Sequence, residues 1–240
     1  MIQVEPCLSE EGLSTFYQGY YSNRKSRTKL SQQRCLQYTI DSQYISKFIS
    51  SGSILDVGCS DGSFLRSLPT SFVKHGIDIE LDSVTSSVDD TLTLHSGFFP
   101  DSKHFSDNSF DLITFRGVIE HLRNPSIFID KAFQLLKPSG IIYFCATPNV
   151  VSPTAQIFKN RWNQWHPIEH PNLFSVKTLQ TLLLPSRFNL VDSAYPYLDT
   201  PYASPENDLS ILLSEVHNPT DIKSPPFWGT MLSAVFKSIA

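Results

Sequence analysis

The feature that most constrains the fold of this chain is the segment ILDVGCSDGSF at residues 54–64. Its apolar first residues predict a strand buried on both faces, as the strands of parallel sheets are. Gly58 and Gly62 follow, and glycine lets the backbone pass close to a ligand because it has no Cβ. A strand, a glycine turn and a helix in this order predict a ligand site at the carboxyl end of the strand.

The residues around this turn indicate what kind of ligand it suits. A dinucleotide-binding turn reads G-x-G-x-x-G and surrounds a pyrophosphate, whereas this turn reads G-x-x-x-G with Asp56 two residues before it. A carboxylate at the turn repels phosphates and suits a cationic group, bound directly or through water. We therefore predict a ligand with a cationic end; an ordinary turn of another doubly wound protein is the alternative.

A second strand is expected within VKHGIDIE, residues 73–80, and it ends in Asp78. Asp78 comes 22 residues after Asp56. A carboxylate about 20 residues beyond a glycine turn, at the end of the next strand, can bind both hydroxyls of a ribose. The sequence therefore predicts that the ligand also carries a ribose.

Two later segments complete an ordered set of four motifs. SFDLITFRGVIEHLRNP at residues 109–125 predicts a strand and a short helix, and LLKPSGIIYFCATPN at residues 135–149 predicts a helix end, a turn and a buried strand. Together the motifs resemble the class I S-adenosylmethionine-dependent methyltransferases, especially the ubiquinone-biosynthesis-like group. The resemblance covers residues 53–149 and, more loosely, 170–190. It implies S-adenosylmethionine as cofactor, S-adenosylhomocysteine as product and no metal ion.

The resemblance also implies roles for individual residues. Asp56, Gly58 and Gly62 would surround the methionine portion of the cofactor, Asp78 would bind the ribose, and Ile79 would stack on the adenine. The residues that follow the fourth strand would pass the sulfonium. The full set of expected cofactor-binding residues is Asp56, Gly58, Cys59, Gly62, Asp78, Ile79, Phe98, Arg116, Gly117 and Val118.

The segment LHSGFFPD at residues 94–101 departs from the family pattern. Relatives usually carry an acidic residue just after the third strand, where it meets the adenine amino group. This chain has Gly97 and Phe98 near that point. The family pattern therefore does not fix the adenine contacts of this segment.

The alternation of strands and helices predicts an α/β fold. We expect a single Rossmann-like, doubly wound sheet of seven mostly parallel strands, with an antiparallel last strand and helices on both faces. The expected strands lie at residues 54–58, 73–78, 92–95, 110–115, 141–147, 188–197 and 231–237. The expected helices lie at residues 30–49, 62–68, 126–136 and 176–184, and Ser175 is the expected N-cap of the last one.

The domain organisation follows from the same pattern. Residues 1–50 are expected to form an N-terminal helical cap, and residues 51–240 the S-adenosylmethionine-binding domain. Insertions at residues 148–174 and 196–228 leave the sheet at or near the carboxyl ends of strands, where open α/β sheets bind ligands. We therefore expect the two insertions to build the acceptor pocket.

The insertions are rich in aromatic residues and prolines. Trp162, Trp165 and Tyr202 are the expected acceptor-binding side chains, because aromatic faces can stack on a sugar or ring. Packing within the protein is the alternative for such a cluster. The prolines of the second insertion favour a shaped lid more than a regular element.

Three histidines are the candidate catalytic residues. Methyl transfer is an in-line displacement, so alignment contributes most, and a base helps mainly when the acceptor is a hydroxyl. His170 is the first choice for that base, followed by His166 and His121; a packing role is the alternative for each. H-P-I-E-H at residues 166–170 is not a zinc pair, because proline stands where H-E-x-x-H needs a regular helix. For Glu120 and His121 together, orienting the short helix that they share is the alternative to a catalytic role.

Composition excludes several classes of protein. The 240 residues can bury one sizeable core, and a net charge of −4 without a long run of Lys and Arg argues against a nucleic acid substrate. The 4 cysteines have no zinc-binding spacing. No apolar run approaches the ~20 residues that span a membrane, and the first residues lack the pattern of a signal peptide. A cytoplasmic location is expected, and the oligomeric state is open.

The expected reaction is O-methylation of a saccharide or another small hydroxylated acceptor. The insertions and the ending PPFWGTMLSAVFK resemble methyltransferases encoded with bacterial surface-polysaccharide genes. Methylation of a quinone, a phenol or another small metabolite is the alternative among enzymes. A protein that binds S-adenosylmethionine without transferring its methyl group is the alternative from another class.

Overall fold

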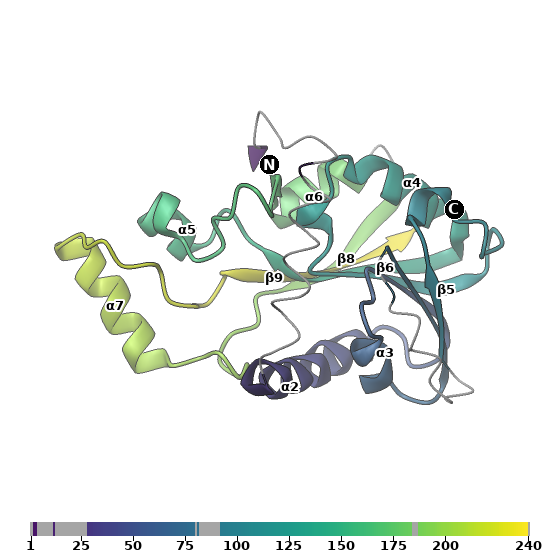
Figure 1. Ribbon diagram of the computed structural model, residues 1–240, viewed down its shortest axis with the longest axis horizontal. Coiled ribbons are helices and arrows are strands. Elements are labelled where there is room, and N and C mark those ends of the chain that lie inside the picture. Colours follow the sequence, from purple (N-terminus) through teal and green to yellow (C-terminus); the bar gives the residue numbers. More distant parts are fainter. Residues whose placement is uncertain are drawn as a thin grey trace.

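A seven-stranded sheet runs through the molecule with helices on both faces (Figure 1). The computed structural model describes residues 2–3, 12, 28–79, 81, 92–183 and 187–239. The strand order is β4-β3-β2-β5-β6-β9-β8. The strands are β2 Gly52–Val57, β3 Phe72–Asp78, β4 Leu92–Ser96, β5 Phe110–Arg116, β6 Leu136–Pro148, β8 Phe188–Ala194 and β9 Met231–Ser238.

The predicted fold class is confirmed. β9 runs antiparallel to both of its neighbours, β6 and β8, whereas the pairs from β4 through β6 are parallel. Each strand expected from the sequence is present, although some ends differ. β6 begins at Leu136, earlier than expected, because that residue still pairs with Phe110 across a register shift.

The helices that cover the sheet are those expected from the sequence, with somewhat different ends. They are α2 Thr28–Ile45, α3 Ser63–Ser67, α4 Pro125–Leu135 and α6 Val176–Leu183. Ser175 caps α6 as predicted: its Oγ accepts the N–H of Thr178, and Thr178 Oγ1 accepts the N–H of Ser175. This reciprocal pair satisfies two backbone donors at the start of the helix. The expected last residue of this helix, residue 184, lies outside the described residues.

Each face of the sheet has its own apolar cluster. Successive residues of a strand point to opposite faces. Leu55 and Val57 of β2 belong to the cluster beneath α4 and α6, whereas Ile54 belongs to the cluster that includes residues of α2 and α3. Figure 1 shows these two pairs of helices on opposite sides of the sheet. The apolar run of β2 therefore follows from its burial on both faces.

The second insertion contains a regular helix, α7 Pro205–His217, so the expectation of a lid without a regular element is wrong. Pro205 stands in the first turn, where the missing N–H of proline costs no hydrogen bond. Glu206 and Asp208 add negative charge at the same end, which favours the helix dipole. Proline therefore starts this helix instead of preventing it. The first insertion also contains a helix, α5 Pro153–Phe158.

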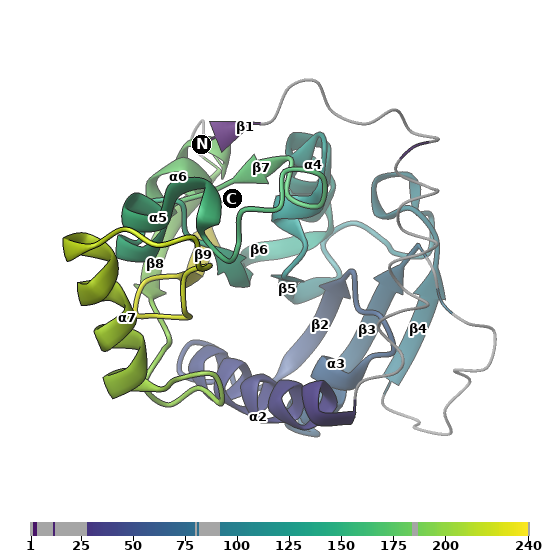
Figure 2. The ribbon, with the colours of Figure 1, turned by 60° about the vertical axis from the view of Figure 1, so that its left-hand side comes forward.

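The N-terminal region touches both insertions. Gln33 Nε2 of α2 donates to the carbonyl oxygen of Pro201 at 3.2 Å. The short strand β1 Ile2–Gln3 pairs antiparallel with β7 Asn172–Leu173 (Figure 2). Much of the expected cap, residues 1, 4–11 and 13–27, lies outside the described residues. Within the part of the chain that the structure describes, no helix has the length and apolar character needed to cross a membrane.

Candidate active site

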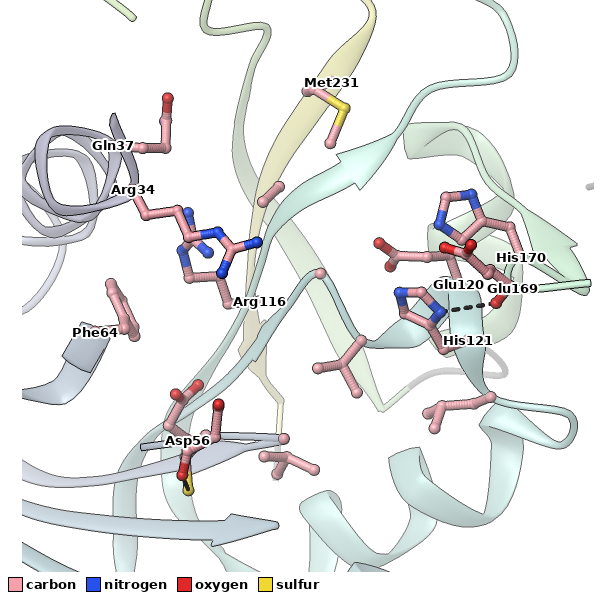
Figure 3. Close-up of a pocket in the computed structure, with 18 of the residues that line it drawn as sticks. Arg34, Gln37, Asp56, Phe64, Arg116, Glu120, His121, Glu169, His170 and Met231 are labelled. Atoms are coloured by element: carbon pink, nitrogen blue, oxygen red, sulfur yellow. Dashed lines mark hydrogen bonds between the residues drawn. The ribbon is translucent and has the colours of Figure 1, made fainter. Parts of the chain in front are cut away.

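A cavity of about 920 Å³ opens at the carboxyl ends of β2, β3 and β5 (Figure 3). It lies beside β2, where the strand order reverses, which is the usual ligand position in an open α/β sheet. Ligand pockets commonly measure about 300–1,000 Å³, and this cavity lies near the upper end of that range. Its walls come from the turn after β2, the loop after β5, α2 and both insertions.

The cavity brings together most of the residues that the sequence singled out. Of the expected cofactor-binding residues, those that line it are Asp56, Gly58, Cys59, Asp78, Ile79, Phe98, Arg116, Gly117 and Val118. The expected catalytic and acceptor residues that line it are His121, His166, His170 and Tyr202. The expected site residues outside its lining are Gly62, Trp162 and Trp165.

The glycine turn packs closely against side chains of neighbouring segments. Gly58 has a φ of +74°, and a Cβ there would lie 2.5 Å from Val118 Cγ2, so no other residue fits without a shift. The N–H of Ser60 donates to Asp78 Oδ2 at 2.8 Å, which ties the turn to the end of β3. Gly62 has a φ of +76° at the N-cap of α3. Gly62 therefore allows the backbone to turn into α3, and it does not line the cavity.

Asp56 is a buried carboxyl near the end of β2, two residues before Gly58 of the glycine turn. Thr114 Oγ1 donates to Asp56 Oδ1 at 2.5 Å. Burial raises the pKa of Asp56 to about 7, against the opposing effects of Thr114 and Arg116. A cationic ligand group close to this carboxyl would favour its ionised form. The side chain is thus suited to the ammonium end of an amino acid.

The rim beyond β3 and β4 exposes large apolar side chains. Ile79 is 55% exposed and Phe98 is 45% exposed, although both line the cavity. Exposed apolar surface beside a cavity is typical of a place where a flat ring binds. Cys59 lies deeper, and burial raises the pKa of its thiol, so it lines the cavity as a neutral group.

Arg116 binds to α2, which the sequence did not indicate. Its Nε donates to Asp41 Oδ2 at 2.8 Å, and its guanidinium lies 4.3 Å from the ring centre of Tyr38. Burial lowers the pKa of Arg116, but Asp41 outweighs this and keeps the guanidinium charged. The residues of α2 that line the cavity are Arg34, Gln37 and Tyr38. No motif marked them, because their place in the site depends on how α2 packs.

A cluster of three histidines lies across the cavity from Asp56, and we call it the histidine cluster: His121, His166 and His170. The ring centres of His121 and His170 are 4.8 Å apart, and those of His166 and His170 are 5.6 Å apart. Figure 3 shows His121 and His170 beside Glu120, well separated from Asp56. Burial lowers the pKa of His170, so its imidazole is neutral at pH 7.

Glu120 is a buried carboxyl beside the histidine cluster. It lies in the short helix η2 Ile119–His121, and only 2% of its surface is exposed. Burial raises its pKa to about 8. Among the described residues, none forms a hydrogen bond with Glu120 Oε2. A buried carboxyl oxygen without a hydrogen bond is costly, and each such group in a native structure calls for an explanation, such as a catalytic role or a bound ion.

The expected acceptor aromatics separate into two groups. Trp162 is 2% exposed and packs with Phe158 and Leu212 in a small apolar cluster, and Trp165 packs against the same cluster. Tyr202 lines the cavity and is 38% exposed. The two tryptophans therefore pack within the protein, as the alternative had it, and do not line the cavity.

Comparison with known proteins identifies the family. A family described as "Methyltransferase domain" matches residues 32–193, which is more than half of the chain. The chain belongs to this family. The match begins within α2 and ends in β8, so it includes the whole glycine turn, the loop after β5 and the first insertion.

Two curated methyltransferases illustrate how far the similarity reaches. Phosphoethanolamine N-methyltransferase 1 of Arabidopsis thaliana is 27% identical over 127 residues, 48% of this chain and 26% of that protein. A ubiquinone biosynthesis O-methyltransferase of Pasteurella multocida is 32% identical over 111 residues, 38% of this chain and 44% of that protein. The chain thus spans less than half of the length of these relatives.

Solved structures share the fold of this chain over nearly its whole length. An S-adenosylmethionine-dependent methyltransferase of Thermotoga maritima has a TM-score of 0.59 at 14% identity, covering 92% of this chain and 97% of that one. The N-methyltransferase NodS of Bradyrhizobium japonicum, in complex with S-adenosyl-L-homocysteine, has a TM-score of 0.54 at 15% identity, covering 90% of this chain and 91% of that one. At these identities the likeness concerns the fold.

Proposed function

We propose that this methyltransferase transfers the methyl group of S-adenosylmethionine to a hydroxyl oxygen of a small acceptor, with a saccharide as the favoured class. The supporting observation is that one cavity has two chemically different halves. The cofactor half comprises Asp56, Gly58 and Asp78 with the rim at Ile79 and Phe98. The acceptor half comprises the histidine cluster and the residues of the two insertions that line the cavity.

The cofactor half suits the three parts of S-adenosylmethionine. Asp56 offers a negative charge for the ammonium group, and Asp78 offers carboxylate oxygens for the ribose hydroxyls. Ile79 and Phe98 offer exposed apolar surface for the adenine. Gly117 lines the cavity, and a Cβ there would lie 3.8 Å from Glu120 Oε1, so this glycine is near the acceptor half, toward which the sulfonium has to point for transfer. Family membership and the bound product in NodS support this cofactor.

The acceptor half suits a molecule with several hydroxyl groups. Asn163, Gln164 and Thr200 supply polar side chains to the wall, and Tyr197 and Phe227 supply aromatic surface. Sugars are recognised by this combination of hydrogen bonds and ring faces. The proline-rich insertions and the ending of the chain, similar to enzymes encoded with surface-polysaccharide genes, favour the same acceptor class.

The chemistry needs mainly alignment. The acceptor oxygen has to approach the methyl carbon in line with the carbon–sulfur bond, and a fixed geometry of this kind can supply most of the acceleration. A hydroxyl also has to lose its proton. The histidine cluster, with His170 as the first candidate, is the part of the cavity that can assist this loss.

A quinone, phenol or other small metabolite is the second candidate acceptor. It is favoured by the similarity to a ubiquinone biosynthesis O-methyltransferase and by the aromatic surface of Tyr197, Tyr202 and Phe227. The same cofactor half would serve it. The two candidates differ in what the acceptor half binds.

A methyl-transfer assay tests the proposal. The protein is incubated with S-adenosylmethionine and a panel of nucleotide sugars, glycans, phenols and quinols, and products heavier by one methylene group are detected by mass spectrometry. Transfer to a sugar hydroxyl is the expected result. Transfer to phenols alone would replace the first candidate by the second. Tight binding of the cofactor without transfer to any class would support a non-catalytic binding protein.

A further inference from the structure

Three side chains of the acceptor half form a group with the composition of a metal site. Glu120, His121 and His170 each offer one ligand atom, and these atoms all lie within 4.8 Å of one another. Glu120 and His121 are adjacent in η2, whereas His170 belongs to the first insertion. We call these three residues the triad. The fold, and not a local sequence motif, brings them together.

The hydrogen bonds of the two imidazoles orient them as metal ligands are oriented. His121 Nδ1 lies 2.7 Å from the carbonyl oxygen of Glu169, and His170 Nδ1 lies 3.0 Å from the carbonyl oxygen of Gln164. A carbonyl oxygen only accepts, so each Nδ1 carries the proton and each Nε2 carries the lone pair. Metal-binding histidines characteristically donate their other ring N–H to a backbone carbonyl in this way.

The carboxyl group of Glu120 provides a second, independent indication. It is almost completely buried, and within the described parts of the chain no donor reaches its Oε2. Its other oxygen, Oε1, lies 3.8 Å from the position that a Cβ on Gly117 would take. An unpaired buried carboxyl oxygen costs free energy, and a bound cation would remove that cost.

We propose that Glu120, His121 and His170 bind one divalent transition-metal ion, with Zn²⁺ as the representative case. Two imidazoles and one carboxylate form a common open site for such ions, in which the remaining positions accept water or substrate. All three residues line the cavity, so those positions face the acceptor half. His170 then serves as a metal ligand instead of the general base that the sequence suggested.

The bound ion also assists methyl transfer. This catalytic role rests on the proposed function. An acceptor hydroxyl bound to the ion loses its proton to water more readily, because the cation stabilises the oxyanion. The oxygen then forms a bond to the methyl carbon as the carbon–sulfur bond breaks. The electron pair of that bond stays on sulfur, which leaves neutral S-adenosylhomocysteine. Acceptors with two neighbouring oxygens are favoured, since both can bind the ion.

Metal binding can be measured without cofactor or acceptor. The full chain is freed of metal with a chelator, and Zn²⁺ is titrated in competition with a chromophoric chelator, with Co²⁺ as a spectroscopic probe of tetrahedral coordination. We expect one ion per chain with micromolar or tighter affinity. Residues that only hydrogen-bond to metal ligands typically contribute about 10- to 100-fold to metal affinity. Glu120→Gln and His170→Asn remove ligands, so each should weaken Zn²⁺ binding by more than that.

A second group of imidazoles provides the matched control. His95 and His104, with ring centres 4.7 Å apart, lie outside the cavity lining. His104→Asn should leave the affinity unchanged. Loss of binding in His104→Asn, with binding retained in the triad variants, would overturn the proposal in favour of adventitious binding by surface imidazoles.

A crystal structure of the wild-type chain with Zn²⁺ keeps the test independent of whether the variants fold. Anomalous scattering at the zinc edge should locate the ion between the triad residues, at about 2.0–2.2 Å from each ligand atom. An ion elsewhere, or none at millimolar Zn²⁺, would overturn the site. Equal methyl-transfer rates with and without the ion would remove its catalytic role and leave the methyltransferase activity standing. Absence of transfer in both forms would contradict the proposed function and leave the metal site to be judged by binding.

Discussion

The two halves of the cavity are built in different ways. In the cofactor half, short turns follow regular strands and are fixed by backbone hydrogen bonds, such as Gly58 N–H to the Ile77 carbonyl oxygen at 2.8 Å. In the acceptor half, side chains join segments far apart in the sequence. Arg161 pairs with Glu215, and the N–H of Asn163 donates to Ser224 Oγ at 2.9 Å.

This difference separates a half built from local turns from a half built by long-range contacts. The cofactor half depends on the register of parallel strands and on a glycine without room for a side chain, so few alternatives are compatible with it. The acceptor half is built mainly by the two insertions, which lie outside the strands of the sheet. Scaffolds of this kind can hold the cofactor constant while insertions change the acceptor.

The largest expected effect concerns the packing of the acceptor half. Trp162→Ala should lower the free energy of unfolding by about 3–5 kcal/mol, because it empties a fully buried site between Phe158 and Leu212. Trp162→Phe is the control, since it keeps apolar volume and removes an indole N–H that has no partner among the described residues. Thermal and denaturant unfolding measure both. A stable Trp162→Ala variant with a raised acceptor KM would instead make this ring part of the acceptor wall.

The next effect concerns the ribose position in the cofactor half. Asp78→Ala should weaken binding of S-adenosylmethionine by about 1.5–3 kcal/mol, the contribution of a hydrogen bond to a charged group. Asp78→Asn separates the loss of the negative charge from the loss of the hydrogen bond to the turn. The asparagine side-chain oxygen can still accept the N–H of Ser60, whereas the charge is lost. Titration calorimetry gives the affinities. An unchanged affinity in Asp78→Ala would move the ribose away from β3.

The pH dependence of cofactor binding tests Asp56. Its pKa of about 7 in the free protein means that the carboxyl becomes protonated as the pH falls below 7. The ammonium of the cofactor favours the carboxylate, so affinity should fall toward about tenfold per pH unit on the acid side. Above about pH 8 affinity should fall again, as the cofactor's own α-amino group loses its proton.

Asp56→Asn is the matched variant for this profile. It should bind S-adenosylmethionine more weakly at pH 7.5 and lose the acid limb, because no carboxyl remains to titrate there. Calorimetry across the pH range measures both effects. The same acid limb in Asp56→Asn and wild type would assign the titration to another group.

The smallest effect concerns the exposed edge of the acceptor half. Tyr202 is 38% exposed, so Tyr202→Ala should raise the acceptor KM by only about two- to twelvefold, equivalent to an aromatic contact of about 0.5–1.5 kcal/mol. Cofactor affinity and melting temperature should not change. Steady-state kinetics with a fixed acceptor checks this, and a parallel loss of cofactor affinity would contradict the division into two halves.

The strand, the glycine turn and their place beside the cavity were largely predictable from the sequence because the information for them is local. Burial of β2 on both faces produces an apolar run, and the turn that follows requires glycine, so both leave a readable pattern. Arg116 was named because it follows the strand expected at residues 110–115, and it is the last residue of β5; its partner Asp41 on α2 was not named. A side chain 75 residues away leaves no signal in a local motif.

The acceptor half was less predictable because its contacts are long-range. The prolines of the second insertion were interpreted as breaking regular structure, although Pro205 begins α7. Trp162 and Trp165 carried the right chemistry for a sugar, but burial against Leu212 on α7 uses that surface for packing. The grouping of Glu120 with His170 also depends on the folded chain, since 50 residues separate them.

A crystal structure with bound S-adenosylhomocysteine tests the division of the cavity most directly. The account predicts the amino-acid end beside Asp56 and Gly58, the ribose at Asp78 and the sulfur directed toward the histidine cluster, with the space beside Tyr202 left open. A product molecule bound across the histidine cluster, with its ribose away from Asp78, would contradict it.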